Sequence, residues 1–506
     1  MWRSLTSWLG LFLFLSAAPA AAQGIKLQWA GTQKVEQIIG DVDWADGTAT
    51  ESQTYTNYDV LANGLGYSFE HFDRTTNTHE QIFLFGDTVA FGTHDGQPVG
   101  AATSVDTTTS PPTFTCPASP QDPTPVDCSK SQYNYHGQDP FAWSTTKDGK
   151  QKLDLHFFMD QTTGLPRFIQ PTDLQNAPFK NGPVARGGDD IPNSGISIGG
   201  EMYMVFSTGS NAGTGKAQNG CSVSHEDSYS VLVHYVQPDQ VFQTLREISY
   251  VEPEDQEESP DPENQEGQRG HFLFTSVHKA VEEGDDTEPM ILMYGVGWFR
   301  CSDVYLALVP QSDFKTLSNV RFFEGLDRNN QPVWSSPTNW NVASDAAAKP
   351  VVRDDVPDGA SPTIGNISVS YTEDLRLWLM TYDSQGQSSN GRRAVYFRYA
   401  AAPWGPWSDP QVIYDPCDGG FGTFIHYDAK NPDACSAPPT VAGPAGPMIA
   451  EELGNDPQKT PGTVFAPYMM ERFTKVEGDT LKIYYTMSTW NPYTVVKMES
   501  DFTIGH

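Results

Sequence analysis

Basic residues are scarce in this sequence. Lys and Arg total 31 against 63 Asp and Glu, which gives a formal net charge of −32. A chain this acidic is repelled by nucleic acid and by anionic membranes, so we expect neither as a partner. The same charge disfavours polyanionic substrates and favours a neutral polysaccharide, although an acidic surface also serves solubility on its own.

Long apolar runs are missing beyond the first residues. Residues 1–22 have the features of an export signal peptide, because Arg3 precedes the apolar segment 9–15 and the alanines at 20–22 provide a small-residue cleavage site. No later stretch reaches the roughly 18 consecutive apolar residues that a transmembrane helix needs. We therefore expect a secreted, extracellular monomer in which residues 23–506 form a single domain.

Cysteine is used sparingly, and its spacing contains no zinc-binding motif. Six cysteines in an exported chain suggest three disulfides, although sequence alone does not give their connectivity. Two pairs each bracket one Pro-containing loop and the remaining two cysteines are left for each other, so we predict Cys116–Cys128, Cys417–Cys435 and Cys221–Cys301. We expect no metal site of the zinc type and no organic cofactor. Whether a structural cation lies on the axis of the fold stays open.

Helical periodicity is nearly absent. Short apolar segments bounded by Gly, Asn, Asp and Pro recur instead, for example at 229–235, 304–309 and 394–399. This pattern indicates an all-β fold, and the length of the chain favours a propeller over a sandwich. Groups of three or four strands leave room for about five blades between residue 55 and the end of the sequence. We predict a five-bladed β-propeller.

Two segments interrupt the strand pattern. Residues 100–132 are rich in Thr, Pro and Ser, and residues 251–269 contain eight acidic residues. The acidic segment has too little apolar surface to offset the entropy of ordering, so we predict a mobile loop there. Strand patterning resumes on both sides of each segment, which favours insertions over domain boundaries.

Two strand-like segments each carry an aspartate at a useful position. Segment 58–70 has Asp59 at its start, and segment 81–88 has Asp87 near its end. If the segments pair antiparallel, the start of one lies beside the end of the other, so both carboxylates reach one edge of the sheet. Glycoside hydrolysis uses such a pair, one as acid and one as base or nucleophile. Either aspartate alone could equally close a turn, but together Asp59 and Asp87 are candidate catalytic residues.

Polar and aromatic residues at strand edges are candidates for substrate contacts. The segment 489–493 combines aromatic and amide groups, which suit sugar binding, although core packing explains them about as well. The residues that we predict to bind substrate are Arg300, Asn366, Tyr468, Trp490 and Asn491. Asn366 also begins the one N-glycosylation sequon, which would be buried and unmodified if its strand is an inner one.

Four stretches resemble a secreted five-bladed propeller family long catalogued as a domain of unknown function. They are Phe-Gly-Asp-Thr at 85–88 and the segments 365–382, 402–408 and 488–498. Members of that family have been assigned as endo-D-arabinanases, which cleave the α-linked D-arabinofuranan of mycobacterial cell walls. The resemblance covers most of residues 55–502. It implies a hydrolase of internal α-D-arabinofuranosidic linkages, with Asp59 and Asp87 at the positions of the family's two proposed catalytic carboxylates.

The chain departs from the family pattern in two places. Leu-Gly does not follow Asp59 directly, and Asn366 stands where the pattern has Glu, a loss that could change specificity or weaken activity. Adjacent strands lie about 4.8 Å apart, and an offset along them adds several ångströms. That favours the carboxyl spacing of about 6.5–9.5 Å found in inverting enzymes, so we predict inversion.

Two other classes of function fit parts of the same pattern. In a non-catalytic carbohydrate-binding propeller, the two aspartates would only hydrogen-bond sugar hydroxyls. A propeller hydrolase could instead act on another neutral furanose polysaccharide. A sialidase-like enzyme is disfavoured, because no cluster of three arginines accompanies the acids to clamp a carboxylate substrate.

Overall fold

The computed structural model describes the parts of the chain that form the strands and their shorter connections. The described residues are 24–43, 48–94, 97–99, 104–106, 113–119, 122–127, 132–135, 139–161, 166–172, 191–208, 229–237, 240–250, 270–280, 288–297, 300–340, 345–387, 393–416, 463–490 and 493–505. The predicted signal peptide and acidic loop lie outside them. Within them the chain is nearly all-β, with short helices α2 (Thr54–Tyr58), η2 (Gln311–Asp313), η3 (Asp345–Ala347) and η6 (Glu471–Phe473). None of the described helices is long and apolar enough to cross a membrane.

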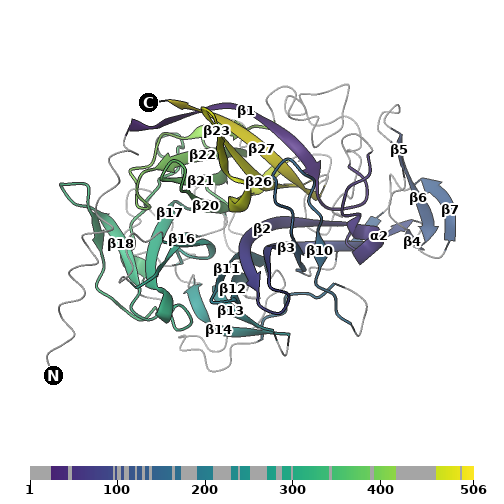
Figure 1. The fold of residues 1–506 in the computed structure, drawn as a ribbon, viewed down its shortest axis with the longest axis horizontal. Helices are drawn as coiled ribbons and strands as arrows, with labels where there is room; N and C mark the ends of the chain where they lie inside the picture. Colours follow the sequence, from purple (N-terminus) through teal and green to yellow (C-terminus); the bar gives the residue numbers. More distant parts are fainter. Residues whose placement is uncertain are drawn as a thin grey trace.

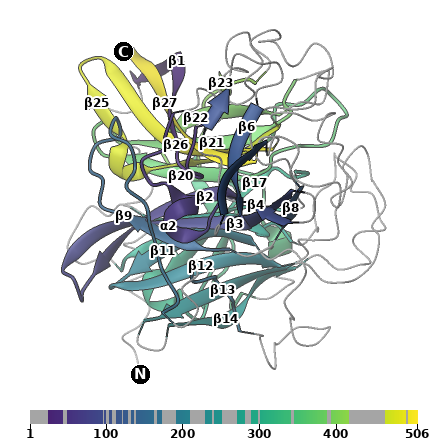
Figure 2. The same ribbon diagram turned by 90° about the vertical axis from the view of Figure 1, so that its right-hand side faces the viewer.

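The strands form five antiparallel blades around a central axis, which confirms the predicted five-bladed β-propeller. Figures 1 and 2 show the blades from two directions, and strands β11 to β14 lie side by side in Figure 2. From the inner strand outward, blade 1 consists of β2 (Ala62–Asp73), β3 (Thr78–His94), β9 (Phe141–Ser144) and β10 (His156–Phe157). Blade 2 consists of β11 (Ile191–Ile198), β12 (Glu201–Thr208), β13 (Tyr229–Val236) and β14 (Val241–Tyr250).

Blades 3 to 5 follow the same inner-to-outer order. They are β15 (Phe274–Lys279), β16 (Met290–Val296), β17 (Val304–Pro310), β18 (Arg321–Leu326), β19 (Pro332–Trp334); then β20 (Ile367–Thr372), β21 (Leu377–Ser384), β22 (Ala394–Ala400), β23 (Gln411–Tyr414); then β24 (Thr463–Met469), β26 (Thr480–Trp490), β27 (Thr494–Gly505), β1 (Lys26–Gln37). Shorter strands extend this frame: β4 (Gln97–Val99) and β8 (Gln132–Tyr135) on β3, β25 (Lys475–Glu477) on β26, and a separate sheet of β5 (Ser104–Asp106), β6 (Thr113–Ser119) and β7 (Asp122–Asp127).

The five inner strands contact one another around the axis. Side-chain hydroxyls join neighbouring blades there: the backbone N–H of Val369 donates to Ser276 Oγ, and that of Met469 donates to Ser368 Oγ, each at 3.0 Å. The inner edge of a sheet otherwise leaves backbone donors unpaired. These serines therefore connect blades 3, 4 and 5 and satisfy exposed edge groups in the same step.

The ring is closed by the first strand of the chain. Strand β1 pairs antiparallel with β27, from Lys26 opposite Gly505 to Gln37 opposite Val496, and so becomes the outer strand of blade 5. Figure 1 shows the purple β1 beside the yellow β27. Thr32 Oγ1 also donates to the carbonyl of Ile413 at 2.6 Å, which ties this closing strand to blade 4.

The hydrophobic core lies between the blades. The central strands are buried on both faces, and every residue of β16, β17 and β21 is buried, so these sheets present apolar side chains to both of their neighbours. Each cluster of buried side chains joins adjacent blades, as shown by Phe85 with Tyr484, Leu84 with Val233, Tyr203 with Phe322, Leu306 with Tyr382, and Phe397 with Phe502. The blades are therefore rigid supports for residues at either end of the axis.

The first predicted strand begins later than the sequence pattern indicated. Residues 54–58 form α2, whose first backbone donors are bound by the Asp41 carboxylate, with Tyr55 N at 2.9 Å and Thr56 N at 3.1 Å from Oδ1. Asp59 ends this helix in the left-handed conformation, with φ 60°, and β2 starts at Ala62. The predicted strand was wrong at this end because a cap from a distant loop stabilises a helical turn.

Candidate active site

The hairpin of β2 and β3 brings Asp59 and Asp87 to one edge of blade 1. Ala62 lies opposite Val89 and Gly64 lies opposite Gly86. Asp59 precedes the first of these pairs by three residues, and Asp87 directly follows Gly86. The antiparallel pairing predicted from the sequence is confirmed, although β3 continues beyond Asp87 instead of ending there.

Asp59 is held by its backbone and not by its side chain. Its N–H donates to the carbonyl of Tyr55 at 2.8 Å, and the next residue, Val60, donates to Thr54 at 3.1 Å. The carboxylate has no hydrogen-bond or ion-pair partner among the described residues. Burial raises the pKa of Asp59 to about 6, because removing water penalises the charged form. A carboxyl group in this state can hold a proton close to neutral pH.

Asp87 is fixed by two residues that the sequence did not identify. Its backbone has φ 54°, and its N–H donates to Asp139 Oδ1 at 3.1 Å. Tyr493 Oη donates to the carbonyl of Gly86 at 3.3 Å. Burial raises the pKa of Tyr493 well above its usual value, and the charges of Asp87 and Asp139 act in the same direction. Tyr493 therefore stays a proton donor and locks the residue before Asp87.

The glycine-rich start of β2 is required by close packing at this edge. A Cβ on Gly64 would lie 2.7 Å from Tyr493 Oη and 3.4 Å from Phe465 Cε2. Gly66 has φ 93°, and Thr486 Oγ1 donates to its carbonyl at 3.0 Å. Asn63, beside Gly64, is fully buried, and neither atom of its amide has a hydrogen-bond partner within the described residues. The motif at 62–66 thus seats blade 1 against blade 5.

Phe465 connects this edge of blade 1 with the predicted substrate residue Arg300. Phe465, which packs at Gly64, lies 5.8 Å from the Arg300 guanidinium, measured to the ring centroid. Burial lowers the pKa of Arg300 to about 10, and nearby Arg393 adds to this while Asp383 opposes it. The guanidinium remains charged near neutral pH. We call this end of the axis, where Asp59 precedes β2 and the inner strands begin, the N-terminal mouth.

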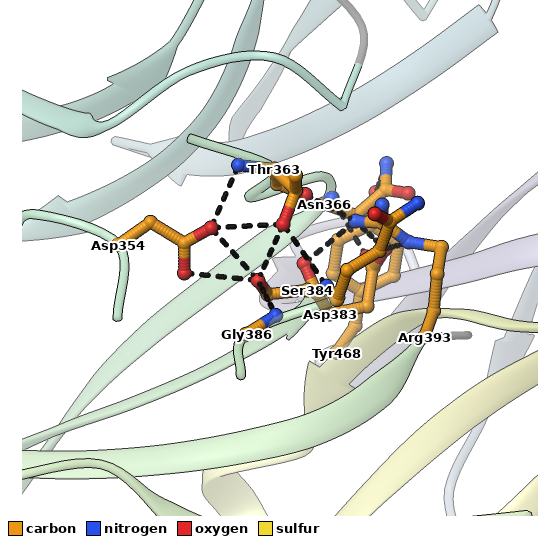
Figure 3. A network of polar contacts seen from close by, with 9 residues as sticks. Asp354, Thr363, Asn366, Asp383, Ser384, Gly386, Arg393 and Tyr468 are labelled. Carbon is orange, nitrogen blue, oxygen red and sulfur yellow. Dashed lines mark hydrogen bonds and ion pairs between the residues drawn. The ribbon is translucent and has the colours of Figure 1, made fainter. Parts of the chain in front are cut away.

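Blade 4 carries a buried ion pair at the N-terminal mouth (Figure 3). Arg393 Nε donates to Asp383 Oδ2 at 2.6 Å, and Nη2 lies 2.6 Å from the same oxygen. The other carboxylate oxygen, Oδ1, accepts from the backbone N–H of Asn366 at 2.8 Å. Asn366 Nδ2 in turn donates to Tyr468 Oη at 2.9 Å. The network joins blade 4 to blade 5 at the start of their inner strands.

A second carboxylate in Figure 3 organises the loop before β20. Asp354 Oδ2 accepts from Thr363 N at 2.7 Å and from Thr363 Oγ1 at 2.9 Å. Ser384 Oγ lies 2.9 Å from both Asp354 oxygens and accepts from Gly386 N at 2.9 Å. The Asp354 carboxylate thus binds only residues of blade 4 and its loop, while the backbone N–H of Asp354 donates to Asp303 Oδ1 at 2.9 Å before β17. Asp354 is therefore a structural anchor, and no motif in the sequence pointed to it.

The structure brings most of the predicted site residues to one mouth. Asp59 and Asp87 share blade 1, and Arg300, Asn366 and Tyr468 meet across blades 3, 4 and 5. Trp490 is the last residue of β26, while Asn491 lies outside the described residues. Asn366 is buried at the start of an inner strand, as the conditional prediction for its sequon required. Whether these residues bind substrate stays a prediction.

The cysteine pairing also stays a prediction. Cys301 is disulfide-bonded, and its predicted partner Cys221 lies outside the described residues. Cys116 falls in β6, whereas Cys128, Cys417 and Cys435 are not described. Among the described side chains, no group of three or more His, Cys, Asp or Glu is placed to hold a metal ion.

Comparison with known proteins places the chain in a family. A family model described as "Domain of unknown function (DUF4185)" matches residues 49–499. The chain belongs to this family. The match covers residues of all five blades, without the outer strand β1, and confirms the family suspected from the four resembling stretches. No curated protein matches the sequence.

Several solved structures are similar to this DUF4185 chain at low identity. A proposed hydrolase from Bacteroides ovatus ATCC 8483 has a TM-score of 0.42 and 11% identity, with 87% of this chain and 86% of that chain covered. An exo-1,5-α-L-arabinanase from a bovine ruminal metagenomic library has a TM-score of 0.33 and 10% identity, with 89% of this chain and 99% of that chain covered. The catalytic domain of a Coprinopsis cinerea α-L-arabinofuranosidase has a TM-score of 0.31 and 10% identity, with 93% of this chain and 98% of that chain covered. At these scores the similarity supports no assignment of activity.

Proposed function

We propose that the protein is a secreted glycoside hydrolase that cleaves internal α-D-arabinofuranosidic linkages of D-arabinan. The observation that carries this proposal is the pair of aspartates at one edge of blade 1, one of which has a pKa raised by burial to about 6. Hydrolysis of a glycosidic bond needs two carboxyl groups, one that donates a proton and one that acts as base or nucleophile. D-arabinan as the substrate rests on the family resemblance alone.

Asp59 is the better candidate for the general acid. Its unpaired, half-buried carboxyl group can carry a proton at mildly acidic pH and deliver it to the glycosidic oxygen as that bond breaks. Asp87, fixed through its backbone by Asp139, would act as the base. In an inverting reaction Asp87 takes a proton from water while the water oxygen attacks the anomeric carbon from the opposite face.

The Arg300 guanidinium would orient the sugar chain. It is half-buried over Phe465 at the same mouth as the aspartates, where it can donate to sugar hydroxyls. The aromatic ring beneath it presents an apolar face to the same space. A neutral furanose polymer suits this combination, because the strongly acidic chain does not favour an anionic one.

The deciding experiment incubates the protein with mycobacterial arabinogalactan, plant L-arabinan and neutral control glycans, and measures new reducing ends. We expect release of oligosaccharides from the D-arabinan-containing polymer only. NMR of the first-formed product anomer then separates inversion from retention. Binding of D-arabinan without new reducing ends would instead support a carbohydrate-binding propeller, and cleavage of plant L-arabinan would move the substrate to another furanose polymer.

A further inference from the structure

A pocket of about 270 Å³ opens at the opposite end of the propeller from the aspartates. It is lined by the later residues of the inner strands, among them 67–70 of β2, 195–197 of β11 and 277–279 of β15. Asp59 and Asn366, in contrast, precede β2 and β20. We call this end, where the inner strands finish, the C-terminal mouth. Its pocket is separate from the candidate active site.

Two tyrosines lie between the pocket and the N-terminal mouth. Tyr67 lines the pocket, and its ring meets the ring of Tyr468 edge-on with 5.1 Å between centroids. Tyr67 Oη donates to the carbonyl of Val277 at 3.4 Å, and Tyr468 Oη accepts from Asn366. Both rings are buried. The pocket therefore has a fixed floor and opens only toward its own mouth.

The wall of the pocket contains an unsatisfied amide. Gln81 lines it with a side chain that is 1% exposed. Gln81 Nε2 donates to Ser68 Oγ at 3.0 Å, while Oε1 has no hydrogen-bond partner among the described residues. If the oxygen and nitrogen of the amide were exchanged, the nitrogen would lack a hydrogen-bond partner instead. Since buried polar groups are nearly always hydrogen-bonded, this amide fits a ligand hydroxyl, which can both donate and accept.

The charges around the pocket are balanced. Glu471 Oε2 lies 3.1 Å from His278 Nε2, and Glu70 Oε2 lies 2.6 Å from Arg472 Nη2. A cation would have to compete with these partners, and an anion would face two carboxylates. Lys279 also lines the pocket, where the charge of Glu471 acts on it, and the remaining lining mixes serine hydroxyls with apolar and aromatic groups, including Phe69. Neutral molecules with several hydroxyls match this lining best.

We propose that the C-terminal mouth binds one neutral, hydroxyl-rich ring, a monosaccharide or cyclic polyol. One hydroxyl pairs with the Gln81 amide and another donates to the Glu471 carboxylate, while Phe69 and Tyr67 cover the less polar face of the ring. A volume of 270 Å³ is at the lower end of small-molecule sites and suits a single ring. The pocket would bind this ring whether or not Asp59 and Asp87 are catalytic.

The test is titration of the full-length secreted protein with D-arabinose, D-xylose and myo-inositol, followed by ligand-observed NMR and calorimetry. Gln81→Leu removes the unsatisfied amide, and Glu471→Gln keeps the shape of an exposed side chain should the first variant fold poorly. Glu477→Gln is the matched control, because Glu477 also pairs with a cation but does not line the pocket. Asp59→Asn reports on binding at the other mouth.

We expect saturable binding of at least one ring, weakened roughly 3- to 10-fold by Gln81→Leu and by Glu471→Gln, as for the loss of one hydrogen bond. Glu477→Gln and Asp59→Asn should leave the affinity unchanged. Absence of saturable binding by all three rings would show that the pocket holds only water and overturn the proposal. Binding weakened by Asp59→Asn alone would place the ring at the N-terminal mouth, and tighter binding of inorganic phosphate than of any ring would replace the neutral ligand with an anion.

Discussion

Two aspartates at the N-terminal mouth are withdrawn from water in different surroundings. Asp383 in blade 4 is fully buried, and its oxygens accept from Arg393 and from the backbone of Asn366. Asp59 in blade 1 is partly buried, has no side-chain partner among the described residues, and has a pKa raised to about 6. A carboxylate buried with partners fixes structure, whereas one buried without them keeps its proton. Only the second kind can serve as a general acid.

The largest expected effect comes from removing the unpaired carboxylate. Asp59→Asn and Asp87→Asn should each lower turnover of D-arabinan by about 100- to 10,000-fold, the range for loss of a general acid or base. The nearly isosteric change should leave the melting temperature within the range of the exposed control Asp409→Asn. Reducing-end assays and thermal unfolding measure both quantities. Near-normal turnover in either variant would remove that aspartate from the mechanism.

Breaking the paired carboxylate should act on stability instead. Arg393→Met leaves Asp383 buried without its cation, which should cost about 3–5 kcal/mol of unfolding free energy. Urea denaturation measures the loss. The double variant Asp383→Leu with Arg393→Met should recover most of it, because an apolar pair replaces the ionic one. A single variant as stable as the wild type would show that the ion pair contributes nothing to the fold.

A smaller loss is expected at the edge of the ion-pair network. Tyr468→Phe removes the acceptor of Asn366 Nδ2 and leaves a buried donor unpaired, at a cost of about 1–3 kcal/mol. Urea denaturation and steady-state kinetics should be measured together. Because the two side chains already bind each other, we expect stability to fall with little change in KM. A clear rise in KM would support the predicted contact with substrate.

The smallest expected effect is a pH dependence of stability that distinguishes the unpaired Asp59 from the paired Asp383. The pKa of Asp59 is raised from 3.8 to about 6 in the folded protein. The favourable contribution of Asp59 to the free energy of unfolding is therefore complete below pH 4 and is lost as pH rises through 6. Asp59→Asn does not titrate. Its stability relative to the wild type should therefore increase by about 1 kcal/mol between pH 4 and 7, after allowance for partial exposure. A flat difference across that range would mean that Asp59 is not desolvated.

The sequence was sufficient for the fold and for the pairing of β2 with β3. Both follow from local patterns: short apolar strands, turn residues between them, and two aspartates, one before the first strand of the hairpin and one in the later part of the second. The structure confirmed the five blades and the shared edge of Asp59 and Asp87. What local patterns cannot show is whether a carboxylate finds a partner once the chain folds.

The contacts that the sequence did not predict join residues that are separated in the chain. Asp139 binds the backbone of Asp87 from 52 residues away, and Tyr468 accepts from Asn366 across 102 residues. The α2 helix is stabilised by Asp41, 14 residues before it. The Asn366–Tyr468 contact depends on the packing of blade 4 against blade 5, which no short motif in a single sequence encodes. The α2 turn also shows tertiary capping overriding the strand-like pattern around Asp59.

Closure of blade 5 by β1 has a consequence for biosynthesis. Strand β1 precedes the other described strands and pairs with β27, which follows them, and Thr32 Oγ1 and Ser500 Oγ lie 2.6 Å apart across 468 residues. Until β27 is made, β1 is an unpaired edge, the kind of surface that pairs with other chains. Ring formation must therefore be a late, all-or-none step that waits for β27. A ribosome that stalls before β27 would release a chain with four potential blades and no means of joining them into a circle.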